Sequence, residues 1–215
     1  MPAPRIKICG ITNEADARLA AELGADAIGL NFHPESPRFV SPTAVEGILR
    51  ALPPLVEPVG VFVNQPLREV FATLNVFGRI RTVHWYGDKS ELCDAYPFQY
   101  IPTFPVRDRD SLRAITGYLD MARSLNRLPS AIAVDAHAPG QYGGTGRPLP
   151  WQLLADFQPG VPLILAGGLT PENVATAVRV VRPYAVDVAS GVESEPGRKD
   201  GEKMRQFIAA ARSAG

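Results

Sequence analysis

Hydrophobic and polar residues alternate along this chain in two patterns. Short apolar runs of strand length recur, and between them apolar residues repeat at the spacing of a helix face. Clear helix faces are Leu67, Val70, Phe71 and Leu74; Leu112, Ile115, Leu119 and Ala122; and Val174, Ala177, Val178 and Val181. The predicted strands are Arg5–Cys9, Ala27–Phe32, Pro58–Val63, Thr82–Trp85, Gln99–Phe104, Ala131–Asp135, Pro162–Ala166 and Ala185–Ala189.

Eight strand–helix units in 215 residues fit a compact (β/α)8 TIM barrel of the α/β class. The fourth and sixth helices have the weakest patterns. A doubly wound parallel sheet produces the same alternation, so periodicity alone leaves it open. No linker or composition break interrupts the chain, and we therefore expect residues 1–215 to form a single catalytic domain.

Two helix starts are legible. Ser41 before Pro42, and Thr170 before Pro171, each place a capping residue next to a proline suited to the first helical position.

Composition narrows the function classes. Hydrophobic residues make up 46% and charged residues 20%, as in globular proteins, and the net charge is zero, which argues against a nucleic-acid surface. No apolar run reaches membrane-spanning length. Cys9 and Cys93 match no metal spacing, and the three scattered histidines form no metal site. We expect a cytoplasmic protein that binds neither membrane nor nucleic acid.

Two polar residues, Cys9 and Asp135, stand where predicted strands end, on the face that carries the active site of a barrel, and Arg38 lies in the loop after the second strand. Cys9 is a candidate base or nucleophile, although a free cysteine also packs as a small buried residue. Asp135 is a candidate general acid, whose pKa would need raising by partial burial, or else a structural acid. Arg38 could bind a substrate carboxylate through its planar guanidinium, or it could equally be a solvated cation in a loop.

Small residues follow several strands and would let a ligand approach the backbone. The segment 136–150 is expected to form a lid, and the loops after the seventh and eighth strands are expected to bind phosphate. The small residues expected to contact the ligand are Gly144, Gly146, Gly167, Gly168, Ser190 and Gly191.

Lys7 and Asp187 suggest a further interaction inside the barrel. Lys7 lies two residues before Cys9, so both side chains point to the same side of the first strand. Asp187 lies in the last strand, which neighbours the first in a closed barrel. We predict that the two residues form an ion pair that positions Cys9.

Together the motifs of this chain resemble phosphoribosylanthranilate isomerase, a barrel enzyme family of tryptophan biosynthesis. The matching segments are KICGIT at Lys7–Thr12, GLNFHPESPRFV at Gly29–Val40, VGVFVN at Val59–Asn64, VDA at Val134–Ala136 with GGTG after it, LILAGGLTPENV at Leu163–Val174, and VDVASGVESEPGRKD at Val186–Asp200. They occur in family order over nearly the whole chain.

The resemblance implies an Amadori rearrangement of N-(5-phosphoribosyl)anthranilate, with no metal or organic cofactor and a small phosphoribosyl substrate as the partner. By motif, Cys9 would be the general base, Asp135 the general acid, and Arg38 the ligand of the anthranilate carboxylate. Nearby positive charge, with Lys7 as one source, would help to ionise the Cys9 thiol. The pattern is compatible with a monomer or a homodimer.

One departure from the family stands after the fourth strand. The family reads close to Val-Gln-Leu-His-Gly-Asp, where this chain has Val83-His84-Trp85-Tyr86-Gly87-Asp88. Tyr86 thus occupies the position of the family histidine, and His84 that of the glutamine. The two side chains should share a strand face and could together replace the usual polar pair near the substrate.

Two alternatives stay open at this point. The analogous isomerase of histidine biosynthesis uses aspartates as both acid and base, so Cys9 speaks against it. A non-catalytic barrel that binds a phosphorylated ligand would need no acid–base pair, so Cys9 and Asp135 together speak against that.

Overall fold

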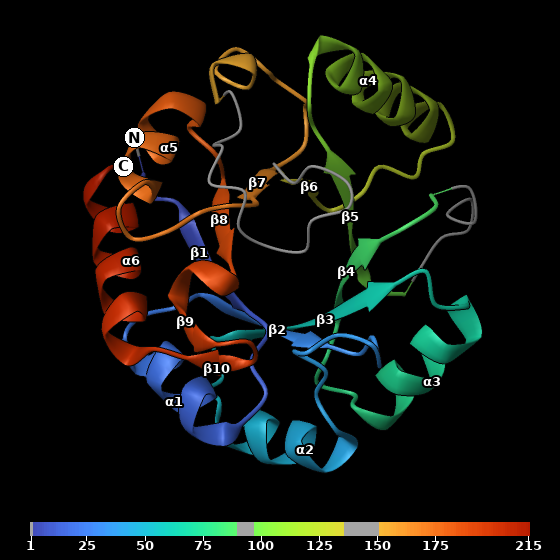
Figure 1. The fold of residues 1–215 in the computed structure, drawn as a ribbon. Helices are drawn as coiled ribbons and strands as arrows, with labels where there is room; N and C mark the ends of the chain where they lie inside the picture. Colours follow the sequence, from blue (N-terminus) through green and yellow to red (C-terminus); the bar gives the residue numbers. More distant parts are fainter. Residues whose placement is uncertain (1, 90–96, 136–150) are drawn as a thin grey trace.

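A closed barrel of eight parallel strands forms the centre of the molecule (Figure 1). The computed structural model describes residues 2–89, 97–135 and 151–215. Neighbouring strands pair in chain order, and β1 also pairs with β8 to close the barrel. The strands are β1 (Arg5–Cys9), β2 (Ala27–Asn31), β3 (Glu57–Val63), β4 (Thr82–Tyr86), β5 (Gln99–Pro105), β6 (Ile132–Asp135), β7 (Leu163–Ala166) and β8 (Ala185–Val188). The predicted TIM barrel is confirmed, and the doubly wound sheet is excluded.

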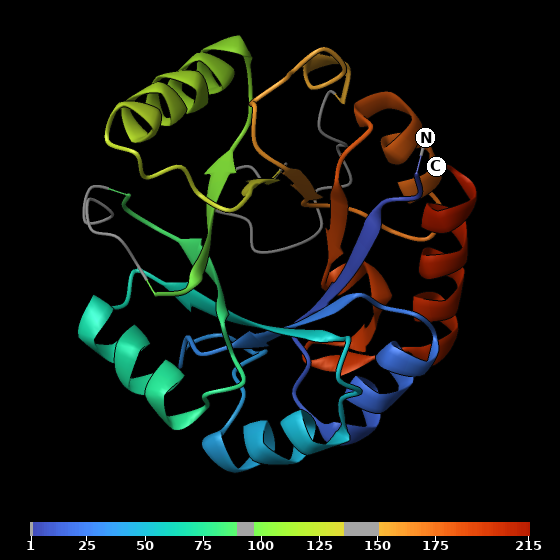
Figure 2. The same ribbon diagram turned by 180° about the vertical axis from the view of Figure 1, so that it is seen from behind.

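Helices surround the barrel on its outer side (Figures 1 and 2). They are α1 (Glu14–Glu22), α2 (Pro42–Ala51), α3 (Leu67–Val76), α4 (Arg109–Ser124), α5 (Val174–Val181) and α6 (Gly201–Ser213). The three helix faces expected from the spacing fall in α3, α4 and α5. In α5 all four residues of the face are buried in the hydrophobic core.

The expected set of eight helices is not complete in the described part of the chain. The connection after β4 includes residues 90–96, which lie outside the described residues. After β6, the described chain resumes with only a short 3₁₀ helix, η1 (Trp151–Leu153), before β7. These are the two positions where the hydrophobic pattern is weakest.

One of the two predicted helix starts is confirmed, and the other is wrong. Ser41 caps α2, and its hydroxyl accepts a hydrogen bond from the backbone N–H of Ala44. Helix α5 begins only at Val174, not after Thr170. The Asn173 side chain accepts from the Thr170 N–H at 2.8 Å, so a separate turn precedes the helix.

The last strand leads into a feature outside the barrel. A short 3₁₀ helix, η2 (Ser190–Val192), is followed by an antiparallel pair of short strands, β9 (Glu193–Glu195) and β10 (Arg198–Lys199). Helix α6 then returns the chain to its start, and the two termini lie side by side in both views (Figures 1 and 2). Within the described residues, no helix is long and apolar enough to cross a membrane.

The barrel interior has an apolar layer and a polar layer. The apolar layer is a small cluster of Ile101, Ala131, Ala133, Ile164 and Ala185. Two residues further along β5 and β8, Thr103 and Asp187 occupy the same strand faces, because strand side chains alternate. A polar layer therefore lies above the apolar one, toward the carboxyl ends of the strands.

Candidate active site

The polar layer inside the barrel consists of four buried side chains: Lys7, His84, Thr103 and Asp187. Each belongs to a different strand, and none is more than 4% exposed. Burial of a charged group is unfavourable unless it is paired, so the arrangement of these groups decides their chemistry.

Lys7 and Asp187 form the predicted ion pair. They are partners in the β1–β8 register, and the Lys7 ammonium lies 2.9 Å and 2.8 Å from the two carboxylate oxygens. Burial disfavours the charged ammonium, but the nearby Asp187 carboxylate and Cys9 outweigh it, so the pKa of Lys7 is raised. Lys7 is therefore a permanent cation beneath the end of β1.

Cys9 ends β1 directly above this pair. It is partly exposed, and no side chain opposes it on β2, where Gly29 is its register partner. A Cβ at position 29 would lie only 2.7 Å from the Cys9 sulfur, so the glycine makes room for the thiol. A side chain at this position on β2 would displace the sulfur from its place.

The sequence suggested that Lys7 would help to ionise the Cys9 thiol, but the pKa of this thiol is raised in the structure. Burial raises the pKa of the thiol, Lys7 lowers it, and the Asp187 carboxylate raises it again. The net pKa is raised, so Lys7 opposes the effect of burial without overcoming it. The reason is that the charge of Lys7 is already neutralised by its own partner.

Asp135 ends β6, two strands away from β8 in the closed barrel, and is partly exposed. Its position at the carboxyl end of the strand agrees with the prediction. Tyr86, at the end of β4, feels the charges of Asp187, Asp135 and Cys9. The structure thus brings the candidate base, the candidate acid and Tyr86 to one mouth of the barrel.

His84 and Tyr86 share a strand face, as the spacing predicts, and their rings lie 4.9 Å apart. Burial, followed by the three anionic neighbours, raises the pKa of Tyr86 well above its usual range, so its hydroxyl stays a proton donor. Burial, with Lys7 adding to it, lowers the pKa of His84 well below its usual range, so the imidazole is neutral.

His84 is completely enclosed, which changes the role expected for it. Its Nε2 shares a 2.8 Å hydrogen bond with the hydroxyl of Thr103, which also bonds the Tyr86 side chain. Its Nδ1 lies 3.7 Å from an oxygen of Asp187, beyond hydrogen-bond length, and has no hydrogen-bond partner in the described chain. His84, which the sequence suggested as a substrate contact, has no exposed surface in this structure.

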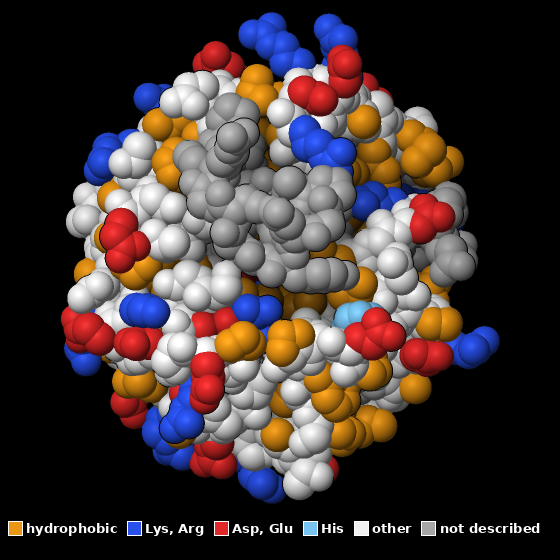
Figure 3. All heavy atoms as spheres, in the orientation of Figure 1, with side chains coloured by type: hydrophobic (Ala, Val, Ile, Leu, Met, Phe, Trp, Pro, Cys, Tyr) orange, Lys and Arg blue, Asp and Glu red, His pale blue; other side chains and the backbone are white. Residues whose placement is uncertain are grey.

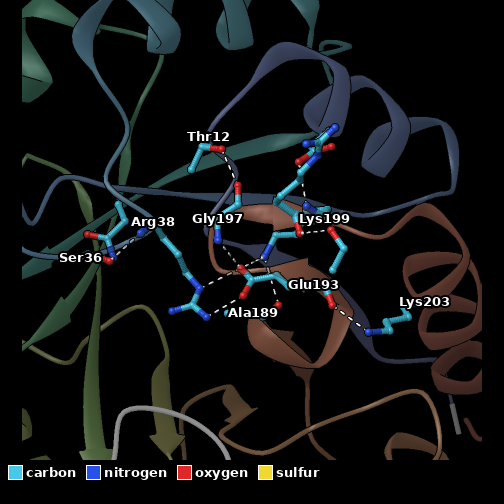
Figure 4. Close-up of polar contacts among 12 residues, drawn as sticks. Thr12, Ser36, Arg38, Ala189, Glu193, Gly197, Lys199 and Lys203 are labelled. Carbon is cyan, nitrogen blue, oxygen red and sulfur yellow. Dashed lines mark hydrogen bonds and ion pairs between the residues drawn. The ribbon is translucent and has the colours of Figure 1, made fainter.

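Arg38 extends from the loop after β2 and meets a residue that the sequence did not suggest as its partner. Its Nε and Nη2 donate to the two carboxylate oxygens of Glu193 at 2.8 Å and 2.6 Å (Figure 4). Arg38 is therefore not a freely solvated loop cation. Lys199 donates to the same carboxylate at 2.8 Å and, like Arg38, lowers the pKa of Glu193 against the effect of burial.

The loops after β7 and β8 lie against each other, as expected of a phosphate site. Gly167 and Gly168 adopt the left-handed backbone region, with φ of 84° and 64°. Gly191 packs on the backbone of the β7 loop, where a Cβ would overlap the carbonyl oxygen of Leu169. Ser190 stands beside it at the start of η2. Gly144 and Gly146 lie outside the described residues.

On the face drawn in Figure 3, basic, acidic and hydrophobic side chains border a hollow near the middle of the barrel. Within residues 2–89, 97–135 and 151–215, no group of three or more His, Cys, Asp or Glu side chains could hold a metal ion. The charged groups of the site are instead paired with one another.

Sequence reasoning did not assign Gly29, Thr103, Glu193 or Lys199 to the site. The sequence does show a glycine in the middle of a predicted strand and acidic and basic residues after the last strand, but it does not show what they contact. Their partners, however, are distant in the chain. Gly29 and Cys9 are 20 positions apart, and Arg38 and Glu193 are 155 positions apart. Only the folded chain brings such residues together.

Comparisons with known proteins identify the family of this chain. Residues 6–210 match the family model of N-(5'-phosphoribosyl)anthranilate isomerase. An isomerase of that name from Geobacter sulfurreducens is 47% identical over 209 residues, which are 97% of this chain and 98% of the relative. The crystal structure of phosphoribosyl anthranilate isomerase from Thermotoga maritima matches with a TM-score of 0.87 and 38% identity, over 98% of this chain and 99% of that one.

A further solved structure carries a bound molecule. It is a phosphoribosyl anthranilate isomerase in complex with reduced 1-(o-carboxyphenylamino)-1-deoxyribulose 5-phosphate, 35% identical with a TM-score of 0.83, over 98% of this chain and 99% of that chain. The chain described here belongs to the phosphoribosylanthranilate isomerase family, and it is an isomerase of tryptophan biosynthesis.

Proposed function

We propose that this chain rearranges N-(5-phosphoribosyl)anthranilate to 1-(2-carboxyphenylamino)-1-deoxyribulose 5-phosphate, with Cys9 as general base and Asp135 as general acid. The observation that carries this assignment is the convergence of Cys9, Asp135 and Tyr86 at one mouth of the barrel, above a buried ion pair. The two reacting groups project from β1 and β6, so a sugar between them is approached from two sides.

Two proton transfers by Asp135 and Cys9, followed by a tautomerisation in which C1 gains a proton and the C2 hydroxyl loses one, account for the reaction. Asp135 protonates the furanose ring oxygen, the bond from C1 to that oxygen breaks, and the nitrogen lone pair forms a Schiff base. The Cys9 thiolate then removes the proton from C2, giving an enolamine, and its tautomerisation yields the ketone. These reaction steps exchange no electrons with a cofactor, so residues of the chain can supply all the groups that the steps require.

The remaining site residues bind the substrate in this proposal. Arg38 holds the anthranilate carboxylate, and the Tyr86 hydroxyl donates a hydrogen bond to the sugar or its nitrogen in place of the family histidine. His84 acts one step further out, through Thr103, which bonds both side chains. The phosphate is held by the backbone N–H groups of the small-residue loops, namely Gly167, Gly168, Ser190 and Gly191, with Gly144 and Gly146 closing the site.

A turnover assay with two variants tests the assignment. The substrate is generated in situ and its loss is followed by fluorescence, for the wild type, Cys9→Ala and Asp135→Asn. We expect each variant to lose at least about 100-fold in kcat, since a positioned acid or base contributes roughly 100- to 10,000-fold. Activity that persists in either variant removes that residue from its role. A folded wild type that binds product but does not turn over indicates a non-catalytic barrel.

The chain as a whole is proposed to work as one cytoplasmic catalytic domain, as a monomer or a homodimer. Light scattering of the purified protein over a range of concentrations distinguishes the two assemblies.

A further inference from the structure

Glu193 and Lys199 form a second buried charge cluster that the acid–base chemistry does not use. The Glu193 side chain is 5% exposed and the Lys199 side chain is completely buried, although both belong to the β9–β10 hairpin outside the barrel. Burying two charges in a connecting segment is costly unless the geometry serves them well. The contacts of Glu193 therefore indicate what the cluster is for.

Every polar contact of the Glu193 carboxylate comes from a donor. Oε1 accepts from Arg38 Nε at 2.8 Å, from Lys199 Nζ at 2.8 Å and from the Gly197 backbone N–H at 3.4 Å, and Oε2 accepts from Arg38 Nη2 at 2.6 Å. Figure 4 shows the carboxylate between the two cations. The orientation of the Glu193 carboxylate is thus set from several sides.

The fold also constrains the stem of Arg38. The side chain runs over Gly10, where a Cβ would lie 2.6 Å from Cδ of Arg38, and Gly10 has a φ of 76°. The glycine that follows the catalytic cysteine therefore leaves room for the arginine. Gly10 below and Glu193 at the side together hold the guanidinium at the mouth of the barrel.

This orientation leaves one edge of the guanidinium open. A guanidinium has two edges that can bind a carboxylate through two parallel N–H bonds. Glu193 occupies the edge formed by Nε and Nη2. Within the described residues, Nη1 has no hydrogen-bond partner, so the edge formed by Nη1 and Nη2 is available. The net charge of Arg38, Glu193 and Lys199 is one positive unit, which matches one carboxylate.

The same cluster reaches the loop assigned to phosphate. Lys199 donates to the Ala189 carbonyl at 3.1 Å, immediately before Ser190, and Lys203 donates to the Glu193 carbonyl at 2.8 Å. Across the hairpin, Thr12 donates to the Gly197 carbonyl at 2.6 Å. The loops after β1, β2 and β8 are therefore fastened to one another around Glu193 (Figure 4).

We propose that Glu193, held by Lys199, is a positioning residue that presents the open edge of Arg38 to the carboxylate of the aromatic ring and so determines the preference for a carboxylated substrate. This inference rests on the proposed role of Arg38. A neutral residue at position 193 would let the guanidinium turn toward solvent, and this would weaken its contact with the substrate carboxylate.

The test compares two substrates, made by condensing ribose 5-phosphate with anthranilate or with aniline, which lacks the carboxylate. For Glu193→Gln we expect KM for the anthranilate compound to rise by at least about tenfold while kcat changes little, which is the signature of lost ground-state binding. The kinetic constants for the aniline compound should remain as in the wild type. Equal losses on both substrates, or no loss on either, would overturn the inference.

Arg38→Ala separates this inference from the proposed function. If Arg38→Ala removes the preference for the anthranilate compound and Glu193→Gln leaves it intact, only the role of Glu193 is refuted. If Arg38→Ala leaves the preference intact, the assigned role of Arg38 is itself wrong, and the role of Glu193 falls with it.

Two further variants control for folding and for charge. If Glu193→Gln fails to fold because Lys199 is left unpaired, the double variant Glu193→Gln/Lys199→Met removes the buried ammonium, and the same ratio between the two substrates is measured. Glu195→Gln removes a carboxylate from the same hairpin, but one that is 66% exposed and that, among the described residues, pairs only with Arg198 at 3.6 Å. It should leave both the kinetics and the melting temperature unchanged.

Discussion

Two buried ion-pair clusters lie near the mouth of this barrel, and they are built in different ways. Lys7 and Asp187 face each other across paired strands, so the β1–β8 register alone brings them together. Arg38, Glu193 and Lys199 belong to connecting segments, and their contacts depend on how three loops settle on the barrel. The first cluster lies beneath the thiol, and the second lies beside the place that we propose for the aromatic ring.

The comparison shows how charged residues on strands differ from charged residues on loops. Strand-borne charges are held rigidly by the hydrogen-bonded sheet, which suits the reacting atoms. Charged residues in loops need contacts with one another before they have a defined geometry. Here the Glu193 carboxylate makes those contacts with Arg38 and Lys199. We call Lys7 and Asp187 the inner pair, and Arg38, Glu193 and Lys199 the outer cluster. We expect substitutions in the inner pair to affect stability and chemistry, and substitutions in the outer cluster to affect substrate recognition.

Unfolding experiments give the largest contrast between the clusters. Lys7→Met leaves the Asp187 carboxylate buried without its cation, and removal of one partner of a buried pair costs roughly 3–5 kcal/mol. Glu193→Gln should cost less, about 1–3 kcal/mol, because Arg38 is 24% exposed and the glutamine amide oxygen can still accept a hydrogen bond from the buried Lys199 ammonium. Urea unfolding at neutral pH measures both values. A larger loss for Glu193→Gln than for Lys7→Met would invert the comparison.

Two glycines offer a steric version of the same contrast. A methyl group at Gly29 would lie 2.7 Å from the Cys9 sulfur, and one at Gly10 would lie 2.6 Å from Cδ of Arg38. Gly29→Ala should therefore lower kcat, and Gly10→Ala should mainly raise KM, each by about tenfold or more. Steady-state kinetics with the anthranilate substrate check this, and identical changes in the two variants would contradict it.

The ionisation of Cys9 distinguishes the two members of the inner pair. Because burial raises the pKa of the thiol, the thiolate fraction and kcat/KM should increase as the pH rises above neutrality. Lys7→Met removes a cation that favours the thiolate and should raise this pKa further. Asp187→Asn removes an anion that disfavours it and should lower the pKa.

The rate of Cys9 alkylation as a function of pH follows the thiol directly, with Cys9→Ser as the blank for Cys93. Shifts in the same direction for Lys7→Met and Asp187→Asn would show that the pair does not control the thiol by its charge. Glu193→Gln serves as the outer-cluster control, with a smaller shift than either inner variant.

Most of the fold was legible from the chain. The eight strands agree with the apolar runs to within one residue at each end, because strand length and helical periodicity are local properties. The start of α5 was predicted wrongly, because residues 171–173 form a turn and the helix begins only at Val174. A Thr-Pro pattern does not distinguish such a turn from the first turn of a helix.

The chain by itself determined the barrel, the position of Cys9 and Asp135 at strand ends, and the pairing of Lys7 with Asp187, because closure of the barrel makes first and last strands neighbours. Only the tertiary structure decided the partner of Arg38, the full burial of His84 and the raised pKa of Cys9. These depend on contacts between segments far apart in the chain, such as the 155 positions that separate Arg38 from Glu193, and on the exclusion of water, which no local pattern encodes.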